Sequence, residues 1–460
     1  MNKNPLLVPE LREMLASGDA KALGEVCSAA HPAFIAELIS ALSPAEAWAV
    51  VRSVDRHLRA EIFSHLDEEF QVEIVENLNR GDVARLLTDM SPDDRADLVK
   101  RLPEERREMV LPGLAQAERE DIRRLTSYAE GTAGAVMTSD YATLTPGLTV
   151  AQAIERLRQV APDRETIYYA YIVDENRRLL GFVSLRDLII APRTTMVDEI
   201  MHRDAVTAQV DEDQEQVARK IQKYDLIALP VLTAEGALVG IVTHDDAVDI
   251  LVQEQQEDLE KLMAIAGKHE SGSYLRTPAL THFRNRVYWV VSLAVLSLIS
   301  GFIIHRFEHM LAQVIILALY MPMLAATGGN TGSQSAAVVV RALALREIMP
   351  GDALRVLFKE LRIAIMLSGV LGLLTWGRVA FFSWGSELPT GLSLARVGVA
   401  IALALGLQVV SATMIGALLP LGATKLKLDP AVVASPALAT MVDITGLLIY
   451  FTTAQMVLGV

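Results

Sequence analysis

A single carboxylate stands inside a long apolar segment near the end of the chain. Asp443 is the only charged residue between Ala431 and Val460, a stretch long enough to cross a bilayer, which takes about 20 residues of helix. A charge at that depth costs about 3 kcal/mol on insertion scales, and such groups usually serve a function. Because its own segment holds no basic residue, we expect Asp443 to meet a mobile cation. The segment therefore predicts a membrane protein that handles cations.

A buried ion pair is the alternative role for Asp443. The only other charge well inside a predicted span is Arg396, and it lies near the outer end of its span, whereas Asp443 lies near the middle of the last one. Thr440 and Pro436 precede Asp443 by three and seven residues, so the three residues share one helix face. That arrangement favours a lined path over a salt bridge, and it predicts Thr440 and Pro436 as pore-lining residues.

A second candidate pore segment is rich in glycine. Its glycines weaken a helix, and Pro322 removes one backbone hydrogen bond. Interrupted helix is tolerated in a membrane only where it is buried in protein or lines water, so freed carbonyls here would contact a hydrated ion. Close packing of helices through small residues is the alternative. The pore-lining candidates in this segment are Gly328, Gly329, Asn330 and Gln334.

Five apolar segments predict five membrane-spanning helices. They cover about 287–304, 311–340, 361–384, 394–420 and 431–458. Arginine and lysine gather before the first span and in the loops after the second and fourth, which by the positive-inside rule puts the N-terminus in the cytoplasm and the C-terminus outside. The chain begins without the apolar run of a signal peptide. We therefore expect a multi-pass protein of the inner membrane with a cytoplasmic N-terminal half.

Charge divides the chain into two parts. Residues 284–460 hold 12 basic and 7 acidic residues, whereas residues 1–283 hold 30 basic and 49 acidic ones. The strong negative charge of residues 1–283 argues against binding to nucleic acid and favours cationic partners. For any single acidic residue, the alternative is that its charge only keeps the protein soluble. The single cysteine, Cys27, excludes an internal disulfide framework. No motif of a catalytic centre occurs, so we do not expect an enzyme.

An internal repeat with a period of twelve residues runs through residues 42–122. Helix-capping residues such as Ser43 and Asp55 follow the first apolar position of most units, and Pro44 and Pro92 suit the first turn of a helix. Short helices that each bury one edge against the next build a superhelix. The repeated apolar positions are Leu42, Val54, Leu66, Leu78, Met90, Leu102 and Leu114.

A duplicated α/β unit follows the repeat. Each copy is expected to form two strands and a helix, and the helices Val150–Val160 and Gln214–Tyr224 precede the strands. The pattern glycine, two apolar residues, Ser/Thr and an aspartate three residues later occurs twice, and it resembles a tandem pair of CBS domains. That family can hold the ribose of an adenine nucleotide with these side chains, whereas helix capping is the equally weighted alternative. The nucleotide-binding candidates are Ser184, Asp187, Thr243 and Asp246.

The whole chain resembles the MgtE family of magnesium channels, through the glycine-rich segment, the Asp443 segment and the order of the parts. The resemblance implies a multidomain fold: an all-α superhelical domain, an α/β tandem CBS domain and a five-helix polytopic membrane domain. It also implies a homodimer with a pore on the two-fold axis, where Asp443 holds magnesium. The expected domains are 1–130 (superhelical), 131–252 (CBS copies 131–192 and 193–252), 253–283 (acidic connecting helix) and 284–460 (pore).

The resemblance further implies that cytoplasmic Mg²⁺ bridges the acidic domains and closes the pore. The matching regulatory carboxylates are Asp225, Asp246, Asp249, Glu254, Glu257 and Asp258, with Asp93 or Asp94 as the partner in the superhelical domain. ATP at the CBS pair is a second expectation. Three alternatives stay open: a cation-coupled transporter, a channel for another divalent ion such as Ca²⁺ or Co²⁺, and a membrane-anchored nucleotide sensor.

Overall fold

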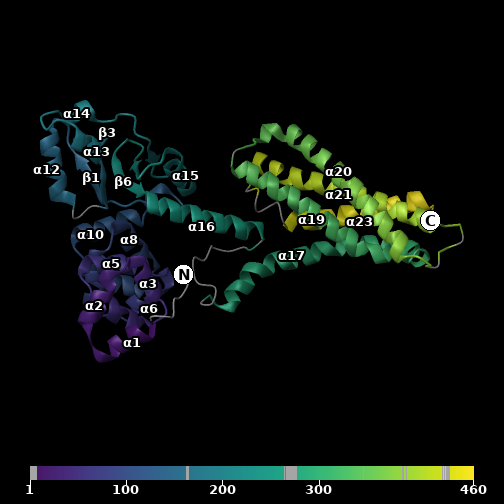
Figure 1. Ribbon diagram of the computed structural model, residues 1–460, viewed down its shortest axis with the longest axis horizontal. Helices are drawn as coiled ribbons and strands as arrows, with labels where there is room; N and C mark the ends of the chain where they lie inside the picture. The colour runs from purple at the N-terminus through teal and green to yellow at the C-terminus, as the bar shows by residue number, and fades with distance from the viewer. Residues whose placement is uncertain are drawn as a thin grey trace. The chain divides into compact units, whose positions relative to one another are not determined.

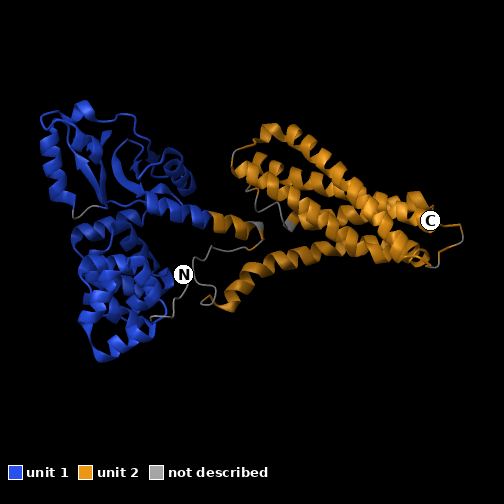
Figure 2. Cartoon of the chain, viewed as in Figure 1, with its two compact units in different colours: residues 1–254, 270–276 blue, residues 255–269, 277–460 orange. Residues whose placement is uncertain are grey.

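The computed structural model describes residues 8–161, 165–263, 265, 277–345, 347–385, 388–389, 391–426, 428, 430 and 436–459. The chain forms two compact units (Figure 2). The first comprises residues 1–254 and 270–276, and the second comprises 255–269 and 277–460. Each is described here by itself.

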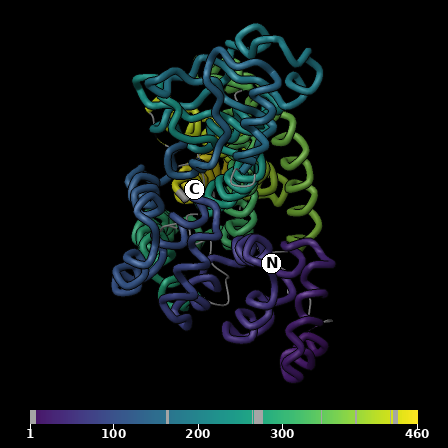
Figure 3. Tube along the Cα trace, turned by 90° about the vertical axis from the view of Figure 1, so that its left-hand side faces the viewer, coloured from purple at the N-terminus to yellow at the C-terminus, as the bar shows by residue number. Residues whose placement is uncertain are grey.

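Short helices build the N-terminal part of the first unit, as the twelve-residue repeat predicts. Their axes stack in successive layers around one apolar core (Figures 1 and 3). Ser43, Asp55, Asp67 and Asn79 each accept a backbone N–H of the helix that follows them, whereas the Ser91 side chain makes no such bond. The helices are α1 (Val8–Ser17), α2 (Ala20–Ala29), α3 (Pro32–Ile39), α4 (Pro44–Val51), α5 (Arg56–Ser64), α6 (Glu68–Glu76), α7 (Arg80–Asp89), α8 (Pro92–Arg101), α9 (Glu104–Val110) and α10 (Gln116–Leu125).

A side-chain hydrogen bond that the sequence analysis missed recurs with the repeat. In five units, the residue five places after the first apolar position donates to the carbonyl of that position. This bond satisfies a carbonyl in the turn between two helices, which would otherwise lack a partner. The pairs are Arg59 to Val54 at 3.0 Å, Gln71 to Leu66 at 3.0 Å, Arg95 to Met90 at 2.8 Å, Arg107 to Leu102 at 3.2 Å and Arg119 to Leu114 at 2.6 Å.

Two three-stranded sheets form the α/β part of the first unit. In each sheet the central strand pairs in parallel with the strand before it and antiparallel with the strand after it. The predicted helices Val150–Val160 (α12) and Gln214–Tyr224 (α15) form with those bounds. The remaining elements are α11 (Ala133–Val136), β1 (Tyr141–Leu144), β2 (Thr166–Val173), β3 (Leu179–Ser184), α13 (Leu185–Ile190), α14 (Val197–Ile200), β4 (Ala208–Gln209), β5 (Ala228–Leu232) and β6 (Leu238–Thr243).

The superhelix and the second α/β copy share a core. Ala96 of α8 and Leu125 of α10 belong to the same buried cluster as Met137 and Val217. The Ser139 hydroxyl also donates to the Asp121 carboxylate at 2.7 Å. The two domains of the first unit therefore dock through both apolar and polar contacts.

Long helices make up the second unit. Within it, α19, α21 and α23 pack against one another, and α20 packs against α21 (Figure 1). The acidic helix α16 (His244–Leu262) begins directly after Thr243, and its later residues belong to this unit. The other helices are α17 (Ala279–Arg306), α18 (Glu308–Gln313), α19 (Ile316–Ala344), α20 (Ala353–Phe382), α21 (Leu394–Lys425) and α23 (Pro436–Leu458).

Among the described residues, four segments are long and apolar enough to cross a membrane: Ala279–Arg306, Pro350–Phe382, Leu394–Lys425 and Ala437–Leu458. The one predicted span that is missing from these four, the second (311–340), corresponds to α19. Its 29 residues extend about 43 Å at about 1.5 Å per residue, which is enough to span, but its glycines and amides make it less apolar.

Two expectations about the spans were wrong. The glycine-rich segment does not interrupt its helix, because α19 is continuous from Ile316 to Ala344 with Pro322 inside it. The third span begins before residue 361, since α20 starts at Ala353 and includes Glu360, which is only 7% exposed. The start of the fifth predicted span, residues 431–435, lies outside the described residues.

Candidate ion sites

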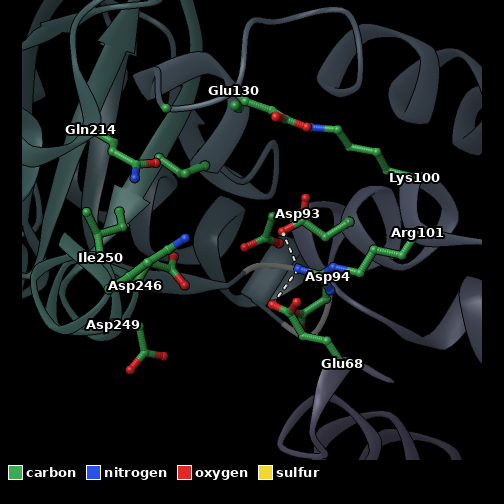
Figure 4. A pocket seen from close by; sticks show the side chains of 15 residues that line it. Glu68, Asp93, Asp94, Lys100, Arg101, Glu130, Gln214, Asp246, Asp249 and Ile250 are labelled. Atoms are coloured by element: carbon green, nitrogen blue, oxygen red, sulfur yellow. Dashed lines mark hydrogen bonds and ion pairs between the residues drawn. The ribbon is translucent and has the colours of Figure 1, made fainter. Parts of the chain in front are cut away.

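An acidic pocket of about 520 Å³ lies in the first unit, between the superhelix and the start of α16. Figure 4 shows Asp93, Asp94 and Arg101 of α8 on one side and Asp246, Asp249 and Ile250 of α16 on the other. Ser91 ends the turn before α8, and Thr243 ends strand β6, so each helix starts at the pocket. The fold therefore brings together four carboxylates that the sequence analysis had named: Asp93, Asp94, Asp246 and Asp249.

Burial and mutual repulsion disfavour the charged forms of these acids. Burial, and next the charge of Asp93, raise the pKa of Asp94 and that of Asp246 to about 7. Burial also raises the pKa of Asp93. The Asp93 Oδ1 atom is buried and accepts no hydrogen bond from the described residues. An unsatisfied buried carboxylate oxygen facing other carboxylates is what a cation would neutralise.

The sequence analysis missed several charged residues of the pocket. Glu68, Asp97 and Glu130 line it together with two basic residues. Lys100 pairs with Glu130 at 2.9 Å, and Arg101 pairs with Glu68 at 2.6 Å. Nothing in their local sequence sets them apart from ordinary surface charge, and only the packing of α6, α8 and the residues after α10 collects them.

Glu165 is a further missed carboxylate. Burial first, and then the charges of Asp93 and Asp246, raise its pKa to about 8. Glu165, which directly precedes β2, is therefore close enough to the pocket carboxylates for their charges to raise its pKa. A comparison of the two α/β copies could have identified Glu165, because the equivalent position in the second copy holds an aromatic residue, Tyr224.

The other regulatory candidates lie elsewhere. Asp225 ends α15 in a left-handed conformation, with φ of 50°, and does not line the pocket. Glu254 accepts a hydrogen bond from Gln214, a pocket residue, at 2.6 Å. Glu257 pairs with Lys261 at 2.8 Å, and Asp258 follows it on α16. In the part of the chain that is described, no three His, Cys, Asp or Glu side chains converge closely enough to enclose a metal by themselves.

Asp443 is exposed on α23, and no hydrogen bond or ion pair joins its carboxylate to another described residue. The alternative partner, Arg396, instead donates from Nε to the Val457 carbonyl at 2.8 Å. Asp443 lines a cavity of about 280 Å³ between α17, α19, α21 and α23. The described residues therefore do not form the alternative salt bridge between Asp443 and Arg396, and Thr440 does not line this cavity.

The candidate pore residues of α19 divide between two faces. Asn330 and Gln334 are exposed, and a Cβ on Gly329 would meet open space. Gly328 is buried, and a Cβ there would lie 3.0 Å from Val442 Cγ1. Gly328 thus serves close helix packing, the alternative that the sequence left open. Thr440 is partly exposed on α23, and the side chain of Pro436 lies outside the described part.

The two α/β copies differ where a nucleotide would bind. Ser184 and Asp187 form a capping box, and His202 Nε2 lies 3.1 Å from the Asp187 carboxylate. His202 stacks on Phe182, with centroids 5.2 Å apart. Phe182 borders a cavity of about 190 Å³ that is also lined by Tyr169, Tyr171, Asp204, Tyr224 and Pro230.

The second copy is acidic at the matching place. Tyr169 pairs with Ser184 in the first sheet, and Ala228 pairs with Thr243 in the second. Tyr169 and Ala228 therefore occupy equivalent positions. Glu165 and Tyr224, which lie four residues before them, are equivalent as well. The Thr243 hydroxyl bonds Asp246, which faces the acidic pocket. Each place draws on both copies: Tyr224 of the second copy completes the aromatic cavity beside Phe182, and Glu165 of the first copy lies near the acidic residue Asp246.

Known proteins share this organisation. Residues 321–453 match the MgtE family, described as a divalent cation transporter, residues 30–131 match the MgtE intracellular N domain, and residues 133–193 and 197–253 match the CBS domain. The magnesium transporter MgtE of Thermus thermophilus is 42% identical over 74% of this chain and 73% of its own length. The Bacillus subtilis protein of that name is 36% identical over 75% of this chain and 73% of its own.

Solved structures agree for the cytosolic part. The cytosolic domain of the Mg²⁺ channel MgtE in complex with ATP is 40% identical, has a TM-score of 0.50, and covers 53% of this chain and all of its own. The soluble part of a magnesium transporter is 30% identical, has a TM-score of 0.51, and covers 54% of this chain and 97% of its own. The chain therefore belongs to the MgtE family of magnesium transporters, which are membrane transport proteins and not enzymes.

Proposed function

We propose that the chain is a magnesium-selective channel through which Mg²⁺ enters the cell down the membrane potential. The observation that carries this proposal is Asp443, a carboxylate on an apolar helix that is exposed and lacks a partner among the described residues. Two charges crossing about 100 mV gain about 4.6 kcal/mol, twice the value for one charge. Entry therefore needs no other energy source.

The chemistry of Asp443 suits magnesium. Mg²⁺ prefers six oxygen ligands and sheds water reluctantly, so a pore can hold it through its waters. In a homodimer, two Asp443 carboxylates on the two-fold axis would meet those waters, and the exposed Asn330 and Gln334 of α19 would add amide oxygens. A single carboxylate per chain keeps binding weak enough for release.

The acidic pocket would supply regulation by the transported ion. Without metal, Asp93, Asp94 and Asp246 repel one another when ionised. Mg²⁺ binding there favours the docked arrangement of the superhelix and α16, and such differential binding shifts the population of a gate. Because the described carboxylates do not enclose a metal by themselves, the bound ion would keep part of its water shell. We infer that cytoplasmic Mg²⁺ closes the channel.

Magnesium entry into liposomes tests the transport proposal. The purified full chain is reconstituted with a negative-inside potential, low internal Mg²⁺ and no other ion gradient. We expect entry with the native chain and a loss of roughly 100-fold with Asp443→Asn, which keeps the shape of the side chain. Thr452→Val, on an exposed position of the same helix, controls for general damage to α23. Equal entry in native chain and Asp443→Asn would contradict the proposal.

A cation-coupled transporter is the second candidate, and one observation favours it. Glu360 is a buried carboxylate in α20, and it accepts a hydrogen bond from Ser335 of α19 at 2.8 Å. A proton-coupled mechanism needs such a group. The same liposomes separate the two functions: entry that requires an imposed proton or sodium gradient, and is lost in Glu360→Gln, would favour the transporter.

We further propose that the aromatic cavity beside Phe182 binds the adenosine part of ATP. A relative's cytosolic domain was solved with ATP, and aromatic rings stack on bases. The equivalent place beside Asp246 of the second copy is acidic, and Glu165 of the first copy lies near it; both carboxylates repel phosphate. We therefore expect one ATP per chain. Tyr224→Ala should weaken ATP binding to the full chain roughly tenfold, whereas Glu165→Gln should not, and binding that ignores Tyr224→Ala would contradict this assignment.

A further inference from the structure

A buried amide lies at the centre of the membrane helices. Gln408 of α21 is 0% exposed, although its neighbours along the helix are apolar. A buried amide without hydrogen bonds is costly, so its retention in an apolar span calls for a role. Neither the resemblance to known channels nor the sequence pattern had drawn attention to it.

Gln408 joins three helices. Its Nε2 donates to the Val442 carbonyl of α23 at 2.9 Å. A carbonyl oxygen only accepts, so the nitrogen must face Val442, and this orients the amide. The amide also lies against two glycines: a Cβ on Gly446 of α23 would be 2.7 Å from Gln408 Cδ, and a Cβ on Gly328 of α19 would be 3.2 Å from the same atom. A methyl group at either position would therefore have to displace the Gln408 amide.

The bonded carbonyl belongs to the residue before Asp443. Gln408, Val442, Asp443 and Gly446 all line the same cavity. The Gln408 Oε1 atom is buried and has no hydrogen-bond partner among the described residues. An unsatisfied buried oxygen in a residue that lines the same cavity as Asp443 calls for an explanation beyond packing.

We propose that Gln408 is a positioning residue for Asp443, and that it sets which hydrated cation the pore accepts. By holding the Val442 carbonyl it fixes the backbone of α23 at Asp443 relative to α21. Selection of a hydrated ion depends on where the carboxylate stands, because Mg²⁺ demands a stricter geometry than Ca²⁺. The inference rests on the proposed role of Asp443 in the pore.

The test compares Mg²⁺ and Ca²⁺ entry into liposomes for the native chain and Gln408→Met, which keeps the length but removes the donor. We expect the Mg²⁺ to Ca²⁺ preference to fall by roughly 10- to 100-fold, as for other residues that orient an ion's ligand, while Mg²⁺ entry persists. Asp443→Asn is measured beside it. Loss of entry in Asp443→Asn with an unchanged preference in Gln408→Met would overturn this inference and leave the proposed function intact. Full entry in Asp443→Asn would overturn both.

A double variant keeps the test decisive if Gln408→Met does not fold. Gly446→Ala alone should disrupt the protein, because its methyl group meets the Gln408 amide, whereas Gly446→Ala with Gln408→Ala should fold, because the smaller side chain frees that space. Gly416→Ala is the control: its Cβ would lie 3.1 Å from the Gly332 backbone carbonyl carbon, so Gln408→Ala should not rescue it. A folded double variant with native ion preference would also overturn the inference.

Discussion

The acidic pocket and the membrane site use the same chemical group in opposite ways. In the pocket, burial and then the charges of neighbouring carboxylates raise the pKa of Asp94 and Asp246, and Lys100 and Arg101 offset part of the negative charge. In the membrane, Asp443 has no charged neighbour in its cavity, and its support is an uncharged amide, Gln408. Mg²⁺ exchanges ligands reluctantly, so a conducting site must bind weakly, whereas a sensor gains from several charges. Under the proposed function, the number of carboxylates, more than their kind, separates the conducting site from the sensing site.

Adding a carboxylate to the membrane site should have the largest effect, because it makes that site more like the acidic pocket. Thr440→Asp puts a second acid one helical turn before Asp443. We expect tighter binding and slower release, so that the half-saturating Mg²⁺ concentration and the maximal rate of entry both fall by about tenfold, which is 1.4 kcal/mol. Liposome flux over a range of external Mg²⁺ measures both. Thr440→Asn is the uncharged control, and a higher maximal rate in Thr440→Asp would contradict the account.

Proton binding should distinguish the pocket from the membrane site. The pKa values of Asp94, Asp246 and Glu165 are raised to about 7, 7 and 8, so these groups stabilise the folded form while protonated, and the contribution is lost as pH rises through 7 to 8. Without metal, we expect the melting temperature to fall by roughly 5 °C between about pH 6 and about pH 8.5.

Millimolar Mg²⁺ should remove most of that fall, because the ion neutralises the same carboxylates. The variant Asp94→Asn with Asp246→Asn should show a flatter profile with or without metal. If the melting temperature drops equally with pH in the native chain and the variant, groups other than Asp94 and Asp246 cause the drop, and the prediction is contradicted.

Removing a positive charge from the pocket should change the Mg²⁺ concentration at which the channel closes, by a smaller amount. Lys100 pairs with Glu130, so Lys100→Met frees a carboxylate and makes the pocket more negative. We expect channel closure at an internal Mg²⁺ concentration lower by roughly threefold, in the range of an exposed ion pair. Lys21→Met removes a similar cation on α2, away from the pocket, and should change nothing. Closure at higher Mg²⁺ in Lys100→Met would argue against a cation site.

The smallest expected effect concerns the superhelix that carries the pocket. Arg107 donates to the Leu102 carbonyl and to the Lys100 carbonyl at 3.0 Å. Arg107→Met should lower the free energy of unfolding by about 1–3 kcal/mol, the range for bonds to charged groups, without changing magnesium closure at a temperature where the protein is folded. Calorimetry measures the loss, and Arg123→Met, an exposed arginine, is the control. A shifted closing concentration in Arg107→Met would instead couple this bond to the gate.

The sequence predicts elements where the pattern is local and repeated. The caps at Ser43 and Asp55 and the helices 150–160 and 214–224 form as expected. The donors of the repeat, such as the buried Arg95, obey the same period of twelve but were missed, because an arginine carries no apolar signal in a sequence pattern. The twelve-residue spacing of these donors is visible in the sequence, whereas the carbonyl that each donor binds is not.

Sites assembled from distant segments were predicted only in part. Asp93 and Asp246 were found by resemblance, whereas Glu68 and Glu130 reach the pocket through packing that no local pattern encodes. In the membrane helices, Gly328 was interpreted as part of an interrupted helix, with close packing as the alternative, and the structure shows that Gly328 lies against Gln408, as does Gly446, which the sequence pattern did not single out. A glycine's role depends on its neighbour on another helix, and sequence spacing does not contain that neighbour.

The most direct test of the central claim, one ion conducted at Asp443 and sensed at the acidic pocket, is a titration of internal Mg²⁺ in reconstituted liposomes. It compares the native chain with Asp94→Asn/Asp246→Asn, and Glu61→Gln, an exposed carboxylate of α5 outside the pocket, is the control. The account predicts that entry into native liposomes shuts off as internal Mg²⁺ rises, while the pocket variant needs at least about tenfold more Mg²⁺ and keeps the native rate of entry when open. Closure of the pocket variant at the native concentration would contradict it.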